Sequence, residues 1–322
     1  MRGLVVATVA WALTLTIGAL ALTRGDYAVP PADVLRTLSG HGTLIMYDVV
    51  VNNRLPRVLV GAGVGAAFAV SGAIFQRLAR NPLVSPDLIG VNAGAALAAV
   101  LMITVLGSGW IPFGALLGSL LAATSVYLLA YRNGLSGHRL VLVGIGVTAV
   151  IGSLTAYLLT LADIYTAKSA SMWLAGSLAG RTWVHVVLVG GTLAVLLPAA
   201  IASTRQLRLL ELGDDLARAL GGRVEVARAV LIALGVGLAA FATAAAGPVA
   251  FVALIAPQLA RRLVAGQPGL LVPAAVGALL VVASDLVART VVAPTALPVG
   301  LITAFLGAPY LLVLLMTDRA GL

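Results

Sequence analysis

The residues of this chain that could do chemistry are few and scattered. The sequence has no cysteine, which excludes a disulfide, a thiolate zinc site and a cysteine nucleophile. Its three histidines, His41, His138 and His185, lie far apart and lack the spacing of metal ligands. The one lysine, Lys168, lies in DIYTAKSA, without the glycines of a phosphate-binding G-x-x-x-x-G-K-[ST] loop. We therefore expect no catalytic residue, no metal and no bound cofactor on this chain, so it is not expected to be an enzyme.

One carboxylate stands out among the apolar segments. Asp285 lies in a long hydrophobic run, four residues before Arg289. Ionisable groups inside a bilayer are costly, so a gradient-driven carrier would use such a carboxylate as an ion or proton site. Four residues is also the spacing at which side chains meet on a helix surface, and an ion pair near a helix end is the interpretation we favour. That pairing argues against proton coupling.

The composition is that of a multi-spanning membrane protein. Hydrophobic residues make up 61% of the chain, charged residues 10%, and the mean hydropathy is +1.09. Soluble domains have about a quarter charged residues. Of the 20 basic residues that give the net charge of +9, all but Lys168 are arginines scattered among apolar runs. We interpret this positive charge as a reflection of how the spans are oriented in the membrane, and not as a sign of nucleic-acid binding.

Ten apolar stretches approach or exceed the length that an α-helix needs to cross a bilayer. They cover residues 3–22, 56–76, 88–106, 111–131, 140–161, 183–203, 229–247, 248–264, 270–290 and 300–317. The first ends without an A-x-A-like cleavage site and is interpreted as a span. The seventh and eighth are separated only by a Gly247-Pro248 breaker, so one long kinked helix is the alternative there. We predict an all-α fold with one transmembrane domain over residues 1–322.

The distribution of basic residues predicts that both termini are cytoplasmic. With the N-terminus inside, the inner side holds thirteen arginines: Arg2, Arg77, Arg80, Arg132, Arg139, Arg205, Arg208, Arg218, Arg223, Arg228, Arg261, Arg262 and Arg319. The outer side holds seven basic residues: Arg24, Arg36, Arg54, Arg57, Lys168, Arg181 and Arg289. Cytoplasmic loops of membrane proteins carry the excess of lysine and arginine.

The charged segment 205–228 lies on the predicted inner side and has a helical pattern. Its leucines at positions 209, 212, 216 and 220 recur every three or four residues, which predicts that they line one face of a helix. Gly213 and Asp214 can open a short helix, and Gly221-Gly222 can close it. An amphipathic helix on anionic lipid and a docking surface for a cytoplasmic partner both fit this pattern.

Four blocks, in order, resemble the membrane permeases of type II ABC importers, which take up ferric siderophores, haem and cobalamin. The first is NNRLPRVLVGAGVGAAFAVSGAIFQRLARNPLVSPDLIGVNAGA, residues 52–95. The others are LGDDLARALGG, AGPVAFVALIAPQLARRLVAG and SDLVARTVVAPTALPVGLITAFLGAPYLLVLL. The resemblance runs from about Arg54 to the C-terminus. It implies ten spans, a second permease subunit, two cytoplasmic ATPases that carry ATP and magnesium, and an extracytoplasmic substrate-binding protein in a bacterial cytoplasmic membrane.

The resemblance also implies roles for particular residues. The ATPase-coupling elbow matches Gly213, Asp214, Asp215, Ala217, Arg218, Leu220 and Gly221. The arginines that dock the binding protein match Arg54, Arg57 and Arg289. The alternative is that these side chains only snorkel to the membrane–water interface. The pore-lining spans offer the hydroxyl groups of Thr148, Ser153, Tyr157, Thr303 and Tyr310. Bonding of such hydroxyls to the preceding helical turn is an equal alternative.

Two departures from the family pattern bear on the partner and the substrate. Gln258 stands where many members have histidine, and Ala296 where many have glutamate. The APQLARR variant is more similar to siderophore permeases that form heterodimers than to the homodimeric cobalamin permeases. We therefore expect a ferric siderophore as substrate and a heterodimer; a cobalamin or haem permease, or a gradient-driven transporter, are the alternatives.

Overall fold

The computed structural model describes residues 2–25, 27–105, 110–132, 137–292 and 295–318, and within these ranges it is helical without any strand. A helix occupies each of the ten predicted positions. These helices are α1 (Arg2–Thr23), α4 (Leu55–Leu78), α5 (Val91–Val105), α6 (Ile111–Ala130), α7 (Gly137–Leu161), α9 (Trp183–Ala202), α12 (Val224–Ala246), α13 (Val252–Val264), α14 (Leu271–Thr290) and α15 (Val299–Asp318). The all-α prediction is confirmed.

Short helices connect the long ones. They are α2 (Pro31–Leu38), α3 (Leu44–Tyr47), α8 (Ile164–Leu174), α10 (Thr204–Glu211) and α11 (Asp214–Ala219), with a π-helical turn η1 (Asp48–Arg54) and a 3₁₀ turn η2 (Pro86–Ile89). Through α3 and η1, the predicted second span becomes a continuous helical segment of 35 residues, Leu44–Leu78. The sequence analysis did not predict this extension.

Seven helical segments are long and apolar enough to cross a membrane within the described part of the chain. Val91–Val105 and Val299–Leu314 are shorter apolar helices. α12 ends at Ala246 and α13 begins only at Val252, so the alternative of one long kinked helix is wrong. Gly247 has a φ of 75°, which favours glycine and directs the chain away from the helix axis.

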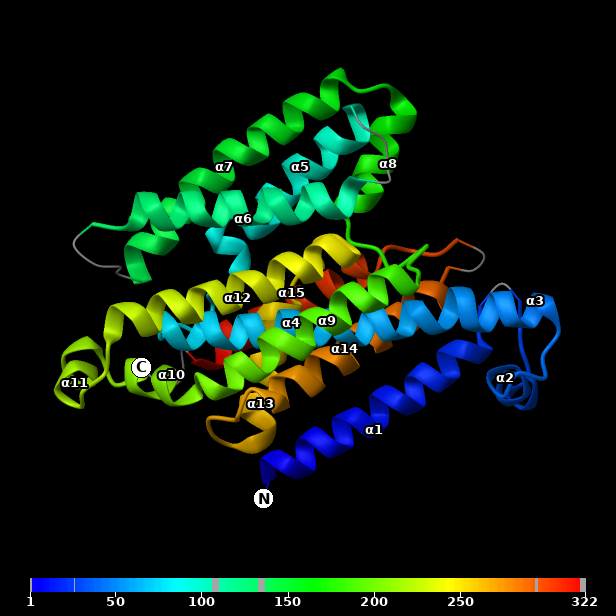
Figure 1. The fold of residues 1–322 in the computed structure, drawn as a ribbon, viewed down its shortest axis with the longest axis horizontal. Coiled ribbons are helices and arrows are strands. Elements are labelled where there is room, and N and C mark those ends of the chain that lie inside the picture. The colour runs from blue at the N-terminus through cyan, green and yellow to red at the C-terminus, as the bar shows by residue number, and fades with distance from the viewer. Residues whose placement is uncertain (1, 26, 106–109, 133–136, 293–294, 319–322) are drawn as a thin grey trace.

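The helix α4 lies at the centre of the fold and packs against α14, α12, α13 and α9 (Figure 1). Of its most apolar window, 78% is buried, whereas only 17% of the α9 window and 11% of the α7 window are buried. A Cβ atom on Gly65 would lie 2.2 Å from the Gly277 carbonyl oxygen, and one on Gly72 would lie 1.7 Å from that of Ala253. The small residues therefore let α14 and α13 pack directly against α4.

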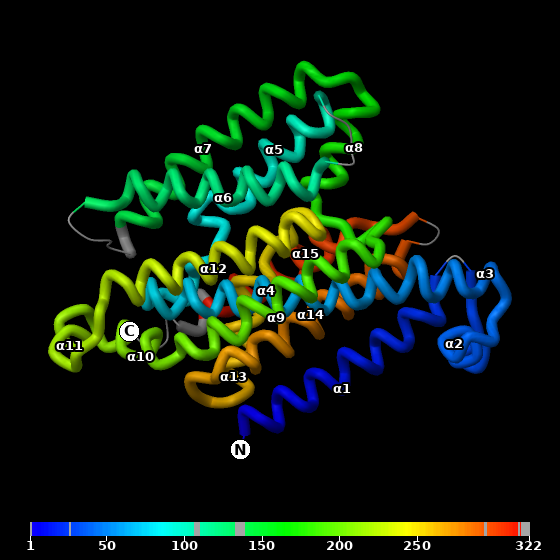
Figure 2. The backbone as a smooth tube through the Cα atoms, viewed as in Figure 1, coloured from blue at the N-terminus to red at the C-terminus, as the bar shows by residue number. Residues whose placement is uncertain are grey.

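The connecting helices occupy opposite ends of the bundle. In Figure 2, the N-terminus, α10 and α11 lie toward one end, and α2 and α3 lie toward the other. Arg54 and Arg57 lie at the α3 end of the long helical segment, and Arg77 lies at the opposite end. The two predicted functional regions are thus at opposite ends of one buried helix.

Candidate functional site

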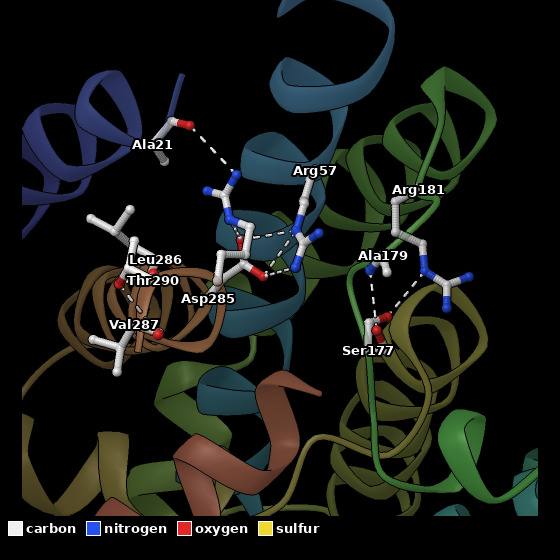
Figure 3. Close-up of polar contacts among 10 residues, drawn as sticks. Ala21, Arg57, Ser177, Ala179, Arg181, Asp285, Leu286, Val287 and Thr290 are labelled. Carbon is white, nitrogen blue, oxygen red and sulfur yellow. Dashed lines mark hydrogen bonds and ion pairs between the residues drawn. The ribbon is translucent and has the colours of Figure 1, made fainter. Parts of the chain in front are cut away.

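Two of the three predicted docking arginines, Arg57 and Arg289, contact the Asp285 carboxylate (Figure 3 labels Arg57 and Asp285). The Arg57 guanidinium donates to both oxygens of the carboxylate, with its Nη2 2.8 Å from Oδ1 and its Nε 3.1 Å from Oδ2. The Nε of Arg289 lies 3.2 Å from Oδ2, so the predicted i,i+4 ion pair is confirmed. These side chains are only 13%, 4% and 8% exposed for Arg57, Asp285 and Arg289, respectively. The bridge between α4 and α14 through Arg57 was not predicted.

Arg54 bonds to the backbone of the segment that follows α1. Its Nη1 donates to the Leu22 carbonyl at 2.7 Å, and its Nη2 donates to the Tyr27 carbonyl. The residue is only 7% exposed. Two guanidinium bonds to carbonyl oxygens fix the loop between α1 and α2 against the start of α4, so Arg54 orders this end of the fold.

Arg181 is a fourth arginine at this end of the fold. From sequence it was not grouped with Arg54, Arg57 and Arg289. Its Nε donates to the Ser177 carbonyl at 3.1 Å, and its Nη1 lies 3.3 Å from Nε2 of His185 (Figure 3 shows the first of these contacts). Burial and the nearby charge of Arg57 lower the pKa of Arg181 to about 10, so the group is still protonated at neutral pH. Only folding brings this loop residue beside α4.

Arg54, Arg57 and Arg289 line a positively charged pocket. It has a volume of about 280 Å³ and is lined by Gly25, Tyr27, Val49, Asn53, Arg54, Arg57, Gly180, Arg289 and Ala296. Three of its lining residues are arginines and none is acidic, while Asp285 lies behind Arg57 and Arg289. Guanidinium groups in such an array suit the recognition of carboxylates. Docking of a binding protein at Arg54, Arg57 and Arg289 stays a prediction.

At the opposite end, the segment 205–228 forms two short helices and not one continuous face. α10 ends at Glu211, and Gly213, with a φ of 102°, separates it from α11. The prediction that the four leucines line one helix is therefore wrong: Leu209 belongs to α10 and Leu216 to α11. The chain still brings apolar side chains to the surface, because Leu212, Leu216 and Leu220 are 55%, 49% and 58% exposed.

The predicted coupling residues divide into buried and exposed groups. Ala217 is 1% exposed and packs inward, while Gly213 and Gly221 adopt left-handed φ angles of 102° and 79° at the two ends of α11. These three residues shape the segment. Asp215, Arg218 and Leu220 are exposed, so they are the predicted coupling residues that a partner can reach.

Ion pairs attach α10 and α11 to the bundle. The Asp214 Oδ1 lies 2.6 Å from Nη2 of Arg228 on α12, and this pairing lowers the pKa of Asp214. Arg77, at the C-terminal end of α4, donates to the Glu211 carboxylate, with side chains 6% and 22% exposed. The two partners of this second pair are 134 residues apart in sequence, which is why sequence spacing gave no signal for it.

A buried amide network lies near the same end. Nε2 of Gln258 donates to Oε1 of Gln76 at 3.1 Å and to the Pro82 carbonyl at 2.8 Å. Nη2 of Arg261 also donates to Oε1 of Gln76, at 3.0 Å. Gln258, where many family members have histidine, thus joins α13 to α4 and to the turn that follows α4.

The five predicted path residues do not form one cluster of free hydroxyl groups. Ser153 donates to Ala149 O at 2.9 Å and Thr303 to Gly300 O at 3.1 Å, which agrees with the alternative of local bonding. Tyr157 is 61% exposed on α7. The Tyr310 ring lies 5.4 Å from the Arg262 guanidinium, and the buried Thr148 hydroxyl has no hydrogen-bond partner in the part of the chain that the structure describes. Their role in a path stays a prediction.

The sequence as a whole matches the model of the FecCD transport family over residues 13–317. The chain belongs to the FecCD transport family. It is similar to the ferric enterobactin permease FepG of Escherichia coli (strain K12), with 42% identity covering 94% of this chain and 92% of the relative. The achromobactin permease CbrC of Dickeya dadantii (strain 3937) is 41% identical and covers 95% and 90%, respectively.

Structural comparison agrees with this family assignment. An ABC transporter solved in an inward-facing conformation superposes with a TM-score of 0.84 and 28% identity, covering 98% of this chain and 99% of the solved chain. The iron(3+)-hydroxamate permease FhuG of Bacillus subtilis (strain 168) is 38% identical over 98% of this chain and 97% of its own length. The predicted resemblance to type II ABC importer permeases is confirmed, and the chain is a multi-pass membrane protein.

Proposed function

We propose that this chain is the membrane-spanning permease subunit of an ABC importer that moves a ferric siderophore into the bacterial cytoplasm. The observation that carries the proposal is the near full-length similarity, at 38–42% identity, to permeases for ferric enterobactin, achromobactin and iron(3+)-hydroxamates. The haemin permease HmuU of Yersinia pestis is less similar, with 36% identity over 85% of this chain. A siderophore is therefore favoured over haem.

In this proposal the whole chain acts as one transmembrane domain in the cytoplasmic membrane with both termini inside. The N-terminal end of α1 lies toward the same end of the bundle as α10 and α11, which supports this orientation (Figure 1). Arg319, counted on the inner side from sequence, lies outside the described residues. The cytoplasmic end then carries the elbow, and the extracytoplasmic end carries the arginine pocket.

A second permease subunit would cover the exposed apolar faces of α7 and α15. On α7, Ile145 and Leu154 are 52% and 49% exposed, and on α15, Phe305 and Leu312 are 77% and 63% exposed. Gly146 and Gly152 on α7 have open space around their Cα atoms, so a partner helix could approach closely there. We favour a different permease as this partner, from the APQLARR resemblance.

Two cytoplasmic ATPases would bind the exposed side of α10 and α11 and would carry ATP and magnesium. The support is geometric: Leu212, Leu216 and Leu220 present apolar surface, and ion pairs join the same segment to α4 and α12. A displacement of the elbow would move α4 through the Arg77–Glu211 pair. Because α4 also carries Arg57, the displacement would reach the outer pocket, where an acidic surface of the binding protein would dock.

The test is ATP-dependent uptake of ferric siderophores, haemin and cobalamin by cells that lack this gene and then regain it. We expect uptake of a ferric siderophore to return with the wild type and not with the Asp214→Lys/Asp215→Lys variant. Asp33→Lys/Asp48→Lys, at the opposite end of the bundle, is the control with the same change of charge. Restored uptake that is insensitive to ATP depletion would identify a gradient-driven transporter instead. Restored uptake of haemin alone would show that haemin, and not a ferric siderophore, is the substrate.

A further inference from the structure

A groove at the predicted cytoplasmic end lies between the end of α9, the helix α10 and the first turns of α12. Its volume is about 430 Å³. The lining residues are Ser203, Arg205, Gln206, Leu209, Leu220, Gly221, Gly222, Arg223, Val226, Ala227 and Val230. The lining contains two arginines and no acidic residue. Of these lining residues, only Leu220 and Gly221 are among the predicted ATPase-coupling residues.

The two arginines of the groove differ from Arg218 and Arg228, which lie nearby. Arg218 and Arg228 form ion pairs with acidic residues of the elbow and of α12. Arg205 and Arg223 are both exposed, and the structure gives neither side chain an ion pair or hydrogen bond within the described residues. Two unpaired guanidinium groups beside one groove, without a carboxylate in its lining, are complementary to an anionic group.

Apart from Ser203 and Gln206, the rest of the lining carries no polar side chain, and it continues onto membrane-spanning helices. Arg223, Val226, Ala227 and Val230 recur at intervals of three and four residues, so they lie on one face of α12. Val226 and Val230 are 59% and 45% exposed. On α9, which enters the groove at its end, Val195 and Ile201 are 68% and 40% exposed. The charged part of the groove therefore lies at the end of two apolar spans, at the depth where phospholipid head groups begin.

We propose that this groove binds an anionic phospholipid of the cytoplasmic leaflet. The phosphate lies between Arg205 and Arg223, and an acyl chain follows Val226 and Val230 along α12 toward the exposed side of α9. A free phosphate ion would satisfy the arginines but would leave the apolar wall in contact with water. The groove borders the proposed ATPase contact, because Leu220 and Gly221 belong to its lining. Leu212, Leu216 and Arg218, which are exposed on the elbow, do not line it, so the ATPase is a poorer fit. Basic pockets between spans on the cytoplasmic side are suited to anionic head groups.

The experiment is native mass spectrometry of the purified full-length protein in detergent, titrated with phosphatidylglycerol or with phosphatidylcholine of the same acyl chains. We expect the wild type to retain phosphatidylglycerol preferentially. Arg205→Gln/Arg223→Gln should weaken this binding about 30-fold, since each basic residue near an anionic surface contributes roughly fivefold. Arg132→Gln/Arg208→Gln removes the same charge from exposed arginines outside the groove and should bind like the wild type.

Three results would overturn the proposal. Phosphatidylglycerol could bind the groove variant as tightly as the charge-matched control, or inorganic phosphate could displace it, which would assign the arginines to a free anion. The groove variant could also lose a purified ATPase subunit while it retains the lipid, which would make the groove an ATPase contact. Unfolding temperatures should match for all variants because the substituted arginines are exposed and unpaired. Lipid retention needs neither ATP nor siderophore, so it is independent of the transport result.

Discussion

The arginine pocket, at the proposed outer end, and the elbow, at the proposed inner end, both contain paired charges, but these are buried in the pocket and exposed on the elbow. At the outer end, Arg57 and Arg289 share Asp285 with side chains at most 13% exposed. At the inner end, Arg218 and Asp215 are 55% and 105% exposed and lie 3.5 Å apart. A buried charge depends on its partner, whereas an exposed pair contributes little to stability. The outer charges therefore order the fold, and the inner charges are free to meet another protein.

The first prediction removes the carboxylate on which the outer end depends. Asp285→Asn should destabilise the protein by about 3–5 kcal/mol, because Arg57 and Arg289 would remain buried without the carboxylate that they share. Denaturant unfolding of the purified protein in detergent would measure the loss. Asp33→Asn, in a pair with Arg36 whose side chains are 28% and 73% exposed, respectively, should change stability by at most about 1 kcal/mol. Equal effects of the two substitutions would contradict the comparison.

The second prediction concerns the exception at the inner end, the buried pair between Arg77 and Glu211. Glu211→Gln should cost about 1–3 kcal/mol, since it leaves a largely buried guanidinium without its carboxylate. It should also reduce uptake more than it reduces ATPase binding, because α10 would lose its link to α4. Glu225→Gln, whose side chain is 44% exposed, is the control and should have a smaller effect on both quantities. A loss of ATPase binding equal to the loss of uptake would show that this pair is not a link.

The third prediction separates binding from stability at the elbow. Leu216→Ser should change the free energy of unfolding by only about 0.5 kcal/mol because the side chain is already half exposed. Binding of the ATPase subunit, measured by co-purification or by titration, should fall roughly tenfold. Leu44→Ser, at the opposite end and 90% exposed, should leave ATPase binding unchanged. If both variants bind the ATPase equally, the leucines of the elbow are not its contact.

The smallest effect is expected for the Asp214–Arg228 pair, whose contribution to stability should depend on pH. Arg228 lowers the pKa of Asp214 below 3.8, so the pair stabilises the protein above that pH and loses its effect as the pH falls through the lowered pKa. At neutral pH, Asp214→Asn should cost at most about 1 kcal/mol, because the carboxylate is 35% exposed. The difference between wild type and variant should vanish in acid, as followed by unfolding at several pH values. A stability difference that grows in acid would contradict a lowered pKa of Asp214.

The Asp285–Arg289 pair could be predicted from sequence, but its bridge to Arg57 could not. Spacing along a helix brings residues four apart together in any helix, so the first pair follows from sequence alone. Arg57 is 228 residues from Asp285, and Arg77 is 134 from Glu211. Only the packing of α14 and α10 against α4 brings these partners together.

By itself, the sequence determined the class of fold, the ten helix positions and the family, because apolar length and ordered motifs are local properties of the chain. It also determined where α11 begins and ends, since glycine favours the left-handed φ angles found at Gly213 and Gly221. The tertiary structure decided which charges are available. Burial and partner choice are set by segments distant in sequence, so Arg54 and Arg57 are bonded within the fold, while Arg205 and Arg223 are exposed and have no ion pair within the described residues.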